Sequence, residues 1–474
     1  MNVDGGEQPS PDICRQAVFS RDARFDGRFF AGAVTTRVYC RPTCPVPFAR
    51  PGNLVWFRSA AEAERAGFRA CQRCRSAASP GSPAWFGTSA VVSRALRLIG
   101  EGALDCGNVE SLADRVGLGP RQLRRLFVEH LGAPPARIAI TRRVYFARHL
   151  IEETQLPIAE VAACAGFRSI RQFNHAMRTI IGESPTELRR IRSSPRPSAP
   201  GPGLVLRLLY HPPLNWTALL AFLGSRAVAG VEFIGAGVYR RTIEIAGSAG
   251  VIEVRHHADQ HQLLVNLELP RYDGLMNIAE RLRRMFDLAA DPRPVAEFLS
   301  QDPLLRPLLA VNPGLRVPGV WDGFEAALRA VLGERLMDQS PGPALARIAR
   351  RFGKPFNGST PGLTSLFPAP QDLAEAELAG CGLSMELAGA VRALAKATLD
   401  GRVKFDASTS FHDMLAGLRA VTEIMPSTAE YIALRAFGEP DAFPLPHGSF
   451  DAERWRPWRA YAAMHLWRAG NSDV

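Results

Sequence analysis

Between residues 91 and 191, hydrophobic residues recur every three or four positions, which is the period of an amphipathic α-helix. Two stretches of this region place a turn between two short helices. The first reads V-E-S-L-A-D-R-V-G-L-G-P-R-Q-L-R-R-L-F, where Gly117 opens the turn and Pro120 begins the second helix. The second reads P-I-A-E-V-A-A-C-A-G-F-R-S-I-R-Q-F-N-H-A-M-R, where Ser169 is the expected N-cap. The pattern predicts two helix-turn-helix segments in tandem.

The second helix of each segment has an apolar face and a polar face. Leu123, Leu126 and Phe127 mark the inward face of the first of these helices. A helix that enters the major groove needs a polar face, because Arg can hydrogen bond guanine and Gln or Asn can hydrogen bond adenine. Amphipathic helices with exposed Arg are common, so the tandem repeat carries more weight than either copy. The candidate DNA-binding residues are Arg121, Gln122, Arg124, Arg125, Arg168, Arg171, Gln172, Asn174 and Arg178.

A different pattern follows residues 193–203, a Pro/Ser/Gly-rich stretch with little reason to fold. Apolar and polar residues alternate over 239–245, 250–255 and 261–269, which predicts strands. Residues 277–288 return to the helical period. The stretch 193–203 is therefore predicted to be a linker, and the chain behind it is mixed in secondary structure.

Length and composition set the broad class. A chain of 474 residues with 46% hydrophobic residues is expected to form three or four globular domains. No apolar run reaches the roughly 18 residues that span a bilayer, and the first ten residues lack the basic and apolar segments of a signal peptide. We therefore expect a cytoplasmic protein with no membrane partner.

The charge is unevenly distributed. The net charge is +11. Residues 1–200 hold 29 Arg, no Lys and 17 acidic residues, which gives +12, whereas residues 201–474 hold 28 basic and 29 acidic residues. Arg-rich codon usage would enrich Arg without favouring one half. An anionic partner such as DNA is therefore expected for the first half.

Four cysteines form two close pairs, in V-Y-C-R-P-T-C and F-R-A-C-Q-R-C. They are Cys40, Cys44, Cys71 and Cys74. Such pairs suit tetrahedral zinc, because each turn delivers two thiolates to one ion. The alternatives are a pair of disulfides or inert core thiols, and nothing marks the protein as secreted, where disulfides persist. Zinc is the expected cofactor.

The run R-F-F-A-G-A-V-T-T-R-V-Y-C-R-P-T-C, followed by A-G-F-R-A-C-Q-R-C, resembles the N-terminal domain of Ada, the bacterial alkylation-response regulator. The resemblance implies that Cys40 accepts a methyl group from a DNA phosphotriester. A zinc-held cysteine is deprotonated, and the thiolate is the nucleophile. Conversion of one thiolate into a neutral thioether would weaken repulsion from DNA, so methyl transfer could act as a switch.

Two further resemblances follow along the chain. The tandem segments, ending in G-E-S-P-T-E-L-R-R, resemble the AraC-type DNA-binding domain. The pieces Y-H-P-P-L-N-W, R-M-F-D-L-A-A-D-P and G-L-R-V-P-G-V-W-D-G-F-E-A-A-L-R-A-V-L-G resemble AlkA, the 3-methyladenine DNA glycosylase. The last resemblance implies a small α/β domain followed by the helical domain of the helix-hairpin-helix glycosylases.

Several residues depart from the glycosylase pattern. Glu423 and Met425 stand where the hairpin of that family has glycines, and Ser427 replaces a pocket tryptophan, although Tyr431 keeps its aromatic position. His447 stands at the position of the catalytic Asp, and a histidine cannot supply a fixed negative charge.

The remaining differences concern the wedge, the acidic group and the scaffold. Arg335 occupies the wedge position, and Asp451 is the nearest acidic substitute for the missing carboxylate. Trp455, Trp458 and Trp467 are interpreted as scaffold, the first two as core rather than pocket. Base excision is therefore expected to be lost or much reduced.

The predicted fold is multidomain and mainly α, with α+β parts. It comprises a four-cysteine zinc domain (10–78), an AraC-type double helix-turn-helix (89–192), a linker (193–203), an AlkA N-terminal-like α/β domain (204–314) and a degenerate helix-hairpin-helix glycosylase-like domain (315–474).

The favoured function is an alkylation sensor that activates transcription, with promoter DNA, alkylated double-stranded DNA and RNA polymerase as partners. One alternative is a bifunctional regulator that also excises 3-methyladenine. Another is a zinc-containing transcription factor without methyl transfer.

Overall fold

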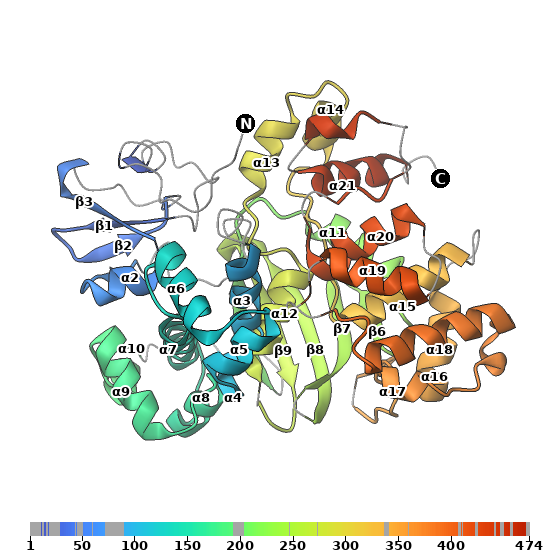
Figure 1. The fold of residues 1–474 in the computed structure, drawn as a ribbon, viewed down its shortest axis with the longest axis horizontal. Coiled ribbons are helices and arrows are strands. Elements are labelled where there is room, and N and C mark those ends of the chain that lie inside the picture. Colours follow the sequence, from blue (N-terminus) through green and yellow to red (C-terminus); the bar gives the residue numbers. More distant parts are fainter. Residues whose placement is uncertain are drawn as a thin grey trace. The chain divides into compact units, whose positions relative to one another are not determined.

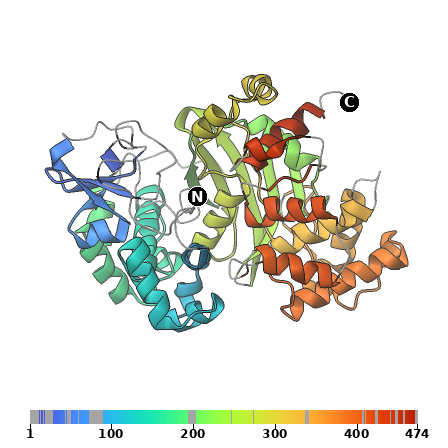
Figure 2. The ribbon, with the colours of Figure 1, turned by 45° about the horizontal axis from the view of Figure 1, so that its top comes forward.

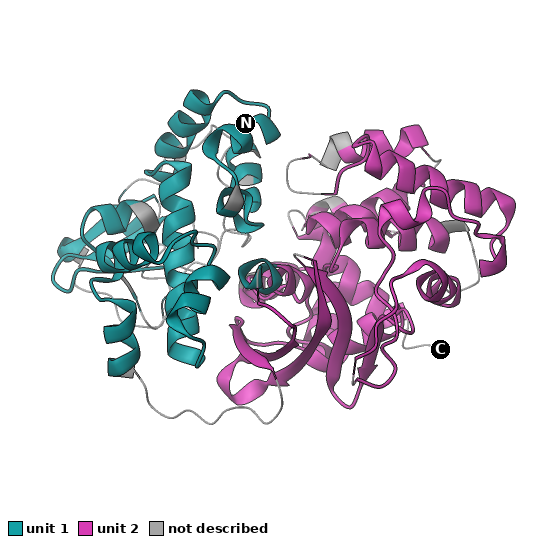
Figure 3. Ribbon diagram, turned by 90° about the horizontal axis from the view of Figure 1, so that it is seen from below, with its two compact units in different colours: residues 1–198, 273–280 teal, residues 199–272, 281–474 magenta. Residues whose placement is uncertain are grey.

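The computed structural model divides the chain into two compact units, residues 1–198 with 273–280 and residues 199–272 with 281–474 (Figure 3). Within the described residues, no helix combines the length and apolar character that crossing a bilayer requires. The structure describes residues 11, 14–15, 18, 29–42, 44, 51–58, 60–71, 90–192, 203–245, 247–272, 274–335, 341–358, 360–405, 409, 411–421, 425–439, 442–445, 450–455 and 458–470.

The first unit begins with a small sheet and one short helix, α2 (Ala60–Arg65), which lies beside the sheet in Figure 1. The sheet order is β3-β1-β2-β4, and only the β2–β4 pair is parallel. Gly67 follows α2 with φ +82°, a conformation that favours glycine, and so ends the helix. The strands are β1 (Phe30–Ala33), β2 (Val38–Cys40), β3 (Leu54–Phe57) and β4 (Arg69–Ala70).

The rest of the first unit is helical, as the periodicity predicts. The side chains of Asn108 and Ser169 each accept a hydrogen bond from the backbone N–H three residues further on, inside the helices they cap. Gly117 and Gly166 sit in the two turns with φ +74° and +77°. The predicted tandem helix-turn-helix segments are thus confirmed. The helices are α3 (Ala90–Gly100), α4 (Ala103–Cys106), α5 (Val109–Arg115), α6 (Pro120–Leu131), α7 (Pro135–Glu153), α8 (Ile158–Cys164), α9 (Ile170–Ile181) and α10 (Pro185–Arg192).

The second unit contains an antiparallel sheet of order β5-β9-β8-β7-β6, whose strands run side by side in Figure 2. The three strands predicted from alternation correspond to β7, β8 and β9. Helix α11 (Trp216–Gly224) connects β5 to β6, and neither of these strands was predicted. The strands are β5 (Leu204–Leu209), β6 (Glu232–Gly235), β7 (Val238–Ile245), β8 (Ser248–His257) and β9 (Gln262–Glu268).

Helices form the remainder of the chain. Helix α15 is buried along most of its length, because it packs against α18, α20 and the π-helical segment Ala433–Phe437. The fold is therefore multidomain and mainly helical with two small sheets, as predicted. The helices are α12 (Leu275–Met285), α13 (Pro292–Leu299), α14 (Leu305–Val311), α15 (Gly323–Arg335), α16 (Gly342–Phe352), α17 (Pro370–Leu373), α18 (Met385–Leu399), α19 (Phe411–Val421), α20 (Pro426–Ile432) and α21 (Arg459–Gly470).

Candidate functional site

Three of the predicted zinc ligands meet at the ends of two parallel strands. Strands β2 and β4 pair Tyr39 with Ala70, so the next residues, Cys40 and Cys71, come side by side. The backbone N–H of Cys44 donates to the Arg41 carbonyl at 3.1 Å, which turns the chain back toward β4. The three Sγ atoms lie within 4.8 Å of one another, and Cys44 Sγ is 3.9 Å from Cys71 Sγ. Tetrahedral zinc with bonds of about 2.3 Å requires S···S separations of about 3.8 Å, so the cluster can hold the ion.

The thiols of this cluster differ in exposure. Cys44 and Cys71 are 0% and 8% exposed, whereas Cys40 at the end of β2 is half-buried. Cys74 lies outside the described residues. Cys14 packs in a separate hydrophobic cluster, where burial raises the pKa of its thiol to about 12. Cys14 therefore stays protonated near neutral pH. Among the three described thiols of the cluster, Cys40 is the most open to a reactant.

A buried carboxyl group lies behind the strand that carries Cys40. The hydroxyl of Tyr39 donates to Glu64 Oε1 at 2.8 Å, and the hydroxyl of Thr141 on α7 donates to Glu64 Oε2 at 3.0 Å. Burial raises the pKa of Glu64, although hydrogen bonds from Tyr145, Tyr39 and Thr141 act in the opposite direction. Glu64 lies on α2, beside the four-stranded sheet of β1 to β4. Its carboxyl group therefore links β2 and α2 to the long helix α7 of the helix-turn-helix region.

The polar face of α6 is exposed as predicted. Arg121, Gln122, Arg124 and Arg125 are all exposed, while Leu123 is fully buried. The guanidinium of Arg124 donates to Glu110 on α5 at 2.8 Å, so this arginine is oriented by the preceding helix. The face can meet an acidic surface without rearrangement of the helix.

The equivalent face of α9 is also accessible. Arg168, Arg171, Gln172 and Arg178 are exposed, and Asn174 is half-buried. Phe173 and Met177 are fully buried on the opposite side, so the apolar stripe of α9 fixes which side chains face outward. The two helices thus present matching polar faces at equivalent positions of the tandem motif.

The second unit contains a cavity of about 500 Å³ lined by the end of α11 and by α15, α20 and α21. Ser427, Tyr431 and Trp467 contribute to its wall. The rings of Tyr431 and Trp467 lie edge to face, with centroids 6.3 Å apart. The volume falls in the range of about 300–1,000 Å³ that is usual for small-ligand sites.

Three family models match separate parts of the chain. Residues 13–76 match the metal binding domain of Ada, residues 112–191 match a helix-turn-helix domain, and residues 205–322 match the AlkA N-terminal domain. The first match covers the three clustered thiols, so the expectation of a zinc module is confirmed.

The chain is also similar to whole curated proteins. The probable bifunctional transcriptional activator/DNA repair enzyme AlkA of Mycobacterium tuberculosis (strain CDC 1551 / Oshkosh) is 38% identical over 476 residues, which cover 96% of this chain and 95% of that protein. The chain belongs to the same family as this M. tuberculosis protein.

Two further relatives match parts of this chain. DNA-3-methyladenine glycosylase 2 of Escherichia coli (strain K12) is 31% identical over 55% of this chain and 95% of its own length. The bifunctional transcriptional activator/DNA repair enzyme Ada of the same strain is 33% identical over 25% of this chain and 32% of its own length. The suspected resemblances to Ada and AlkA are thus confirmed.

The structure describes several residues of the predicted glycosylase site. Ser427 and Tyr431 line the cavity, whereas Met425 is 58% exposed and precedes α20. Asp451 is exposed, and the side chain of Arg335 is not among those described. Glu423 and His447 lie outside the described residues.

Two of the tryptophans differ in role. Trp455 is 1% exposed, and its indole N–H donates to Asp302 at 2.7 Å, so it belongs to the core as predicted. Trp467, interpreted from the sequence as scaffold, lines the cavity. Arg226 and Arg329 also line it, and the sequence analysis missed both because they lie about 100 residues apart and in no motif.

Proposed function

We propose that the chain is a DNA alkylation sensor and transcriptional activator in which Cys40 accepts the methyl group of a DNA methylphosphotriester. The observation that carries the proposal is that Cys40 is the most exposed of the three clustered thiols. A bound zinc ion would keep these thiols deprotonated and fix their positions.

The transfer is a single displacement at the methyl carbon. The Sγ electron pair of Cys40 forms the S–C bond, the C–O bond to the phosphorus ester breaks, and the phosphate oxygen keeps the electron pair. The neutral triester becomes an anionic diester, and the thiolate becomes a neutral thioether. The cluster thereby loses one negative charge and repels the DNA backbone less, which makes methylation a switch for binding.

Double-stranded DNA is the proposed partner of the first unit, with residues 10–78 accepting methyl and residues 89–192 binding the promoter. Helices α6 and α9 carry the exposed Arg and Gln side chains that base-edge and phosphate contacts require. Activation of transcription would bring RNA polymerase to the same promoter as a further partner.

The decisive experiment is mass spectrometry of the full chain after incubation with duplex DNA that carries methylphosphotriesters. We expect one added methyl group, located on Cys40 by peptide mapping and absent from Cys40→Ser. Cys381→Ser, which changes a buried thiol of the second unit, is the control and should be methylated like the parent. A methyl group on another cysteine would refute the assignment.

Excision of 3-methyladenine is a second candidate, favoured by the cavity with its Tyr431 and Trp467 rings. The test is release of free base from alkylated duplex by the full chain. Release that Asp451→Asn abolishes would support excision, with Glu386→Gln, a carboxylate on the surface of α18, as the control. The absence of release would leave sensing and activation as the proposed function.

A further inference from the structure

The second helices of the two helix-turn-helix segments correspond to one another position by position. Helices α6 and α9 both contain 12 residues. Each ends at a glycine in the left-handed conformation, Gly132 with φ +72° and Gly182 with φ +88°. The two helices can therefore be compared residue by residue from their first positions.

An Arg-Gln pair stands at the second and third positions of both helices. The pair is Arg121 and Gln122 in α6, and it is Arg171 and Gln172 in α9. All four side chains are exposed. The two helices thus present the same two hydrogen-bonding side chains in the same order and at the same place in the first turn.

Buried side chains fix the direction of both pairs. Leu123 and Phe127, at the fourth and eighth positions of α6, are fully buried. Phe173 and Met177, at the fourth and eighth positions of α9, are fully buried as well. Residues four apart lie on one face of a helix, so both helices are anchored through the same face. The two Arg-Gln pairs therefore project from equivalent faces.

The first residues of a recognition helix are those that contact base edges in the major groove. Arg donates two hydrogen bonds to O6 and N7 of guanine, and Gln pairs with N6 and N7 of adenine. Consecutive Cα atoms lie about 3.8 Å apart, which is close to the spacing of about 3.4 Å between stacked base pairs. An Arg-Gln pair in the first turn therefore suits a guanine and an adenine in adjacent base pairs.

The sixth position distinguishes the two helices. It is occupied by Arg125 in α6 and by His175 in α9, and both side chains are exposed. Each follows the arginine of its pair by four residues, so it lies on the same face as that arginine. Arg offers a fork of donors, whereas a histidine ring is shorter and offers one nitrogen on each side. The two side chains should therefore select different base pairs.

The fifth position is less available in both helices. Arg124 of α6 donates to Glu110 on α5 at 2.8 Å, and Asn174 of α9 is half-buried. The second, third and sixth positions are therefore the ones from which matched contacts to DNA can be made.

We propose that the DNA site of the first unit consists of two half-sites that share one guanine–adenine step and differ at a neighbouring base pair. The two Arg-Gln pairs would contact the shared step, and Arg125 and His175 would contact the base pair that differs. The proposal rests on the proposed function, in which residues 89–192 bind the promoter. It adds which base pairs the two half-sites have in common and which side chains separate them.

The test is selection of duplexes from a random-sequence pool by the zinc-loaded full chain, followed by sequencing. We expect a consensus in which a guanine and an adenine in adjacent base pairs occur twice. Gln122→Ala should remove the preference for adenine in one half-site, and Gln172→Ala should remove it in the other. In fluorescence anisotropy, replacement of the shared guanine in either half-site should weaken binding about tenfold.

An exchange of the sixth residue tests the difference between the half-sites. His175→Arg gives α9 the same residues as α6 at the second, third and sixth positions, so the two selected half-sites should become alike. Arg125→His is the reciprocal variant and should have the same effect through the other half-site. Both positions are exposed, so the fold should be retained. Arg402→Gln, which changes an exposed arginine paired with Asp400, is the control and should select the parent consensus.

Two results would overturn the proposal. One is a consensus whose half-sites share no guanine–adenine step, and the other is a consensus that His175→Arg and Arg125→His leave unchanged. Enrichment of no sequence would overturn promoter binding as well, whereas methyl transfer to Cys40 is measured separately by mass spectrometry.

Discussion

The hydroxyl of Tyr39 donates a 2.8 Å hydrogen bond to Glu64 Oε1, one residue before the proposed methyl acceptor Cys40. Tyr39 is fully buried, and Glu64 also accepts from Thr141 on α7. The strand that positions Cys40 is therefore tied by one carboxyl group to the longest helix of the helix-turn-helix region.

Loss of the Tyr39 hydroxyl should weaken the first unit. Tyr39→Phe leaves one lone pair of a buried carboxyl unsatisfied, so we expect the free energy of unfolding to fall by about 1–3 kcal/mol. Thermal denaturation of the parent, Tyr39→Phe, Glu64→Gln and the double variant provides a double-mutant cycle. The two effects should be non-additive, and simple additivity would contradict the direct contact.

The raised pKa of Glu64 also predicts a pH dependence. In the folded state this group holds its proton to higher pH than in the unfolded state, where the ordinary value is about 4.5. The stability that protonated Glu64 contributes is complete below that value and is lost as the pH rises through the folded pKa. Denaturant titrations of the parent and Glu64→Gln should therefore show the parent losing stability relative to the variant between pH 4.5 and the folded pKa. A constant difference would argue that the carboxyl is not protonated by burial.

Zinc content should depend on the clustered thiols alone. Cys44→Ser replaces a fully buried member of the cluster, and we expect it to lose most of the zinc and to expose the sheet module to proteolysis. Cys14→Ser is the matched control, since Cys14 is as buried but lies in another cluster and stays protonated. Metal analysis of both purified variants checks this, and full zinc in Cys44→Ser would exclude it as a ligand.

DNA affinity should depend on the exposed face of α9. Arg171→Ala is expected to reduce binding to the preferred promoter duplex by about 1–3 kcal/mol if Arg171 contacts a base edge. If it contacts a phosphate instead, the loss should be uniform across sequences and the salt dependence should fall by about one ion. Fluorescence anisotropy at two or more salt concentrations separates these outcomes. Arg402→Ala, in the second unit, should leave both quantities unchanged.

Loss of one carboxylate from the buried ion pairs of the second unit should lower the free energy of unfolding strongly. Glu325→Gln removes one of two carboxylates that balance Arg241 and Arg329, and we expect a loss of about 3–5 kcal/mol in the free energy of unfolding. Glu244→Gln breaks only an exposed pair with Lys354 and should cost about 0–1 kcal/mol. Urea denaturation of both variants tests the contrast, and similar small losses would indicate that Arg241 and Arg329 are compensated elsewhere.

Local patterns predicted most of the elements because those elements are defined by short-range contacts. The buried stripe through Leu123 and Phe127, and the turn glycine Gly117, are readable from spacing alone. The strands β1 to β4 were not predicted, since none exceeds four residues and alternation cannot be recognised over so short a length.

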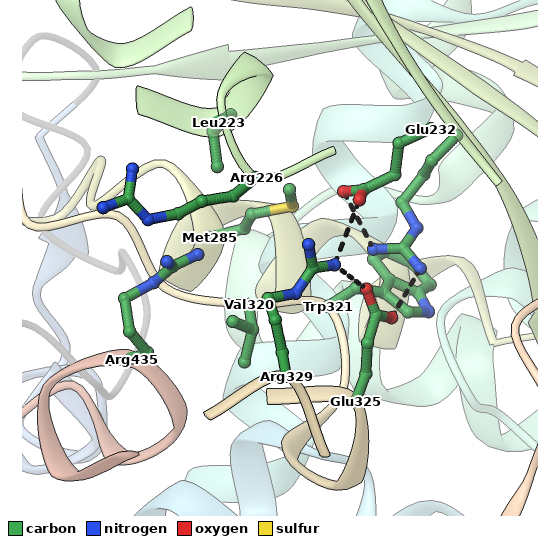
Figure 4. A pocket seen from close by; sticks show the side chains of 10 residues that line it. Leu223, Arg226, Glu232, Met285, Val320, Trp321, Glu325, Arg329 and Arg435 are labelled. Carbon is green, nitrogen blue, oxygen red and sulfur yellow. Dashed lines mark hydrogen bonds and ion pairs between the residues drawn. The ribbon is translucent and has the colours of Figure 1, made fainter. Parts of the chain in front are cut away.

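By itself the sequence determined the Cys40, Cys44 and Cys71 spacing, the tandem helices with their outward arginines, and the alternation of β7 to β9. Each of these properties depends on residues close together in the chain. Only the tertiary structure decided that Tyr39 meets Glu64 and that Arg226, Glu232, Glu325 and Arg435 line one small space (Figure 4). Those arrangements depend on packing between distant segments, and the electrostatic effect of a charge is set by the partners and the burial that packing brings.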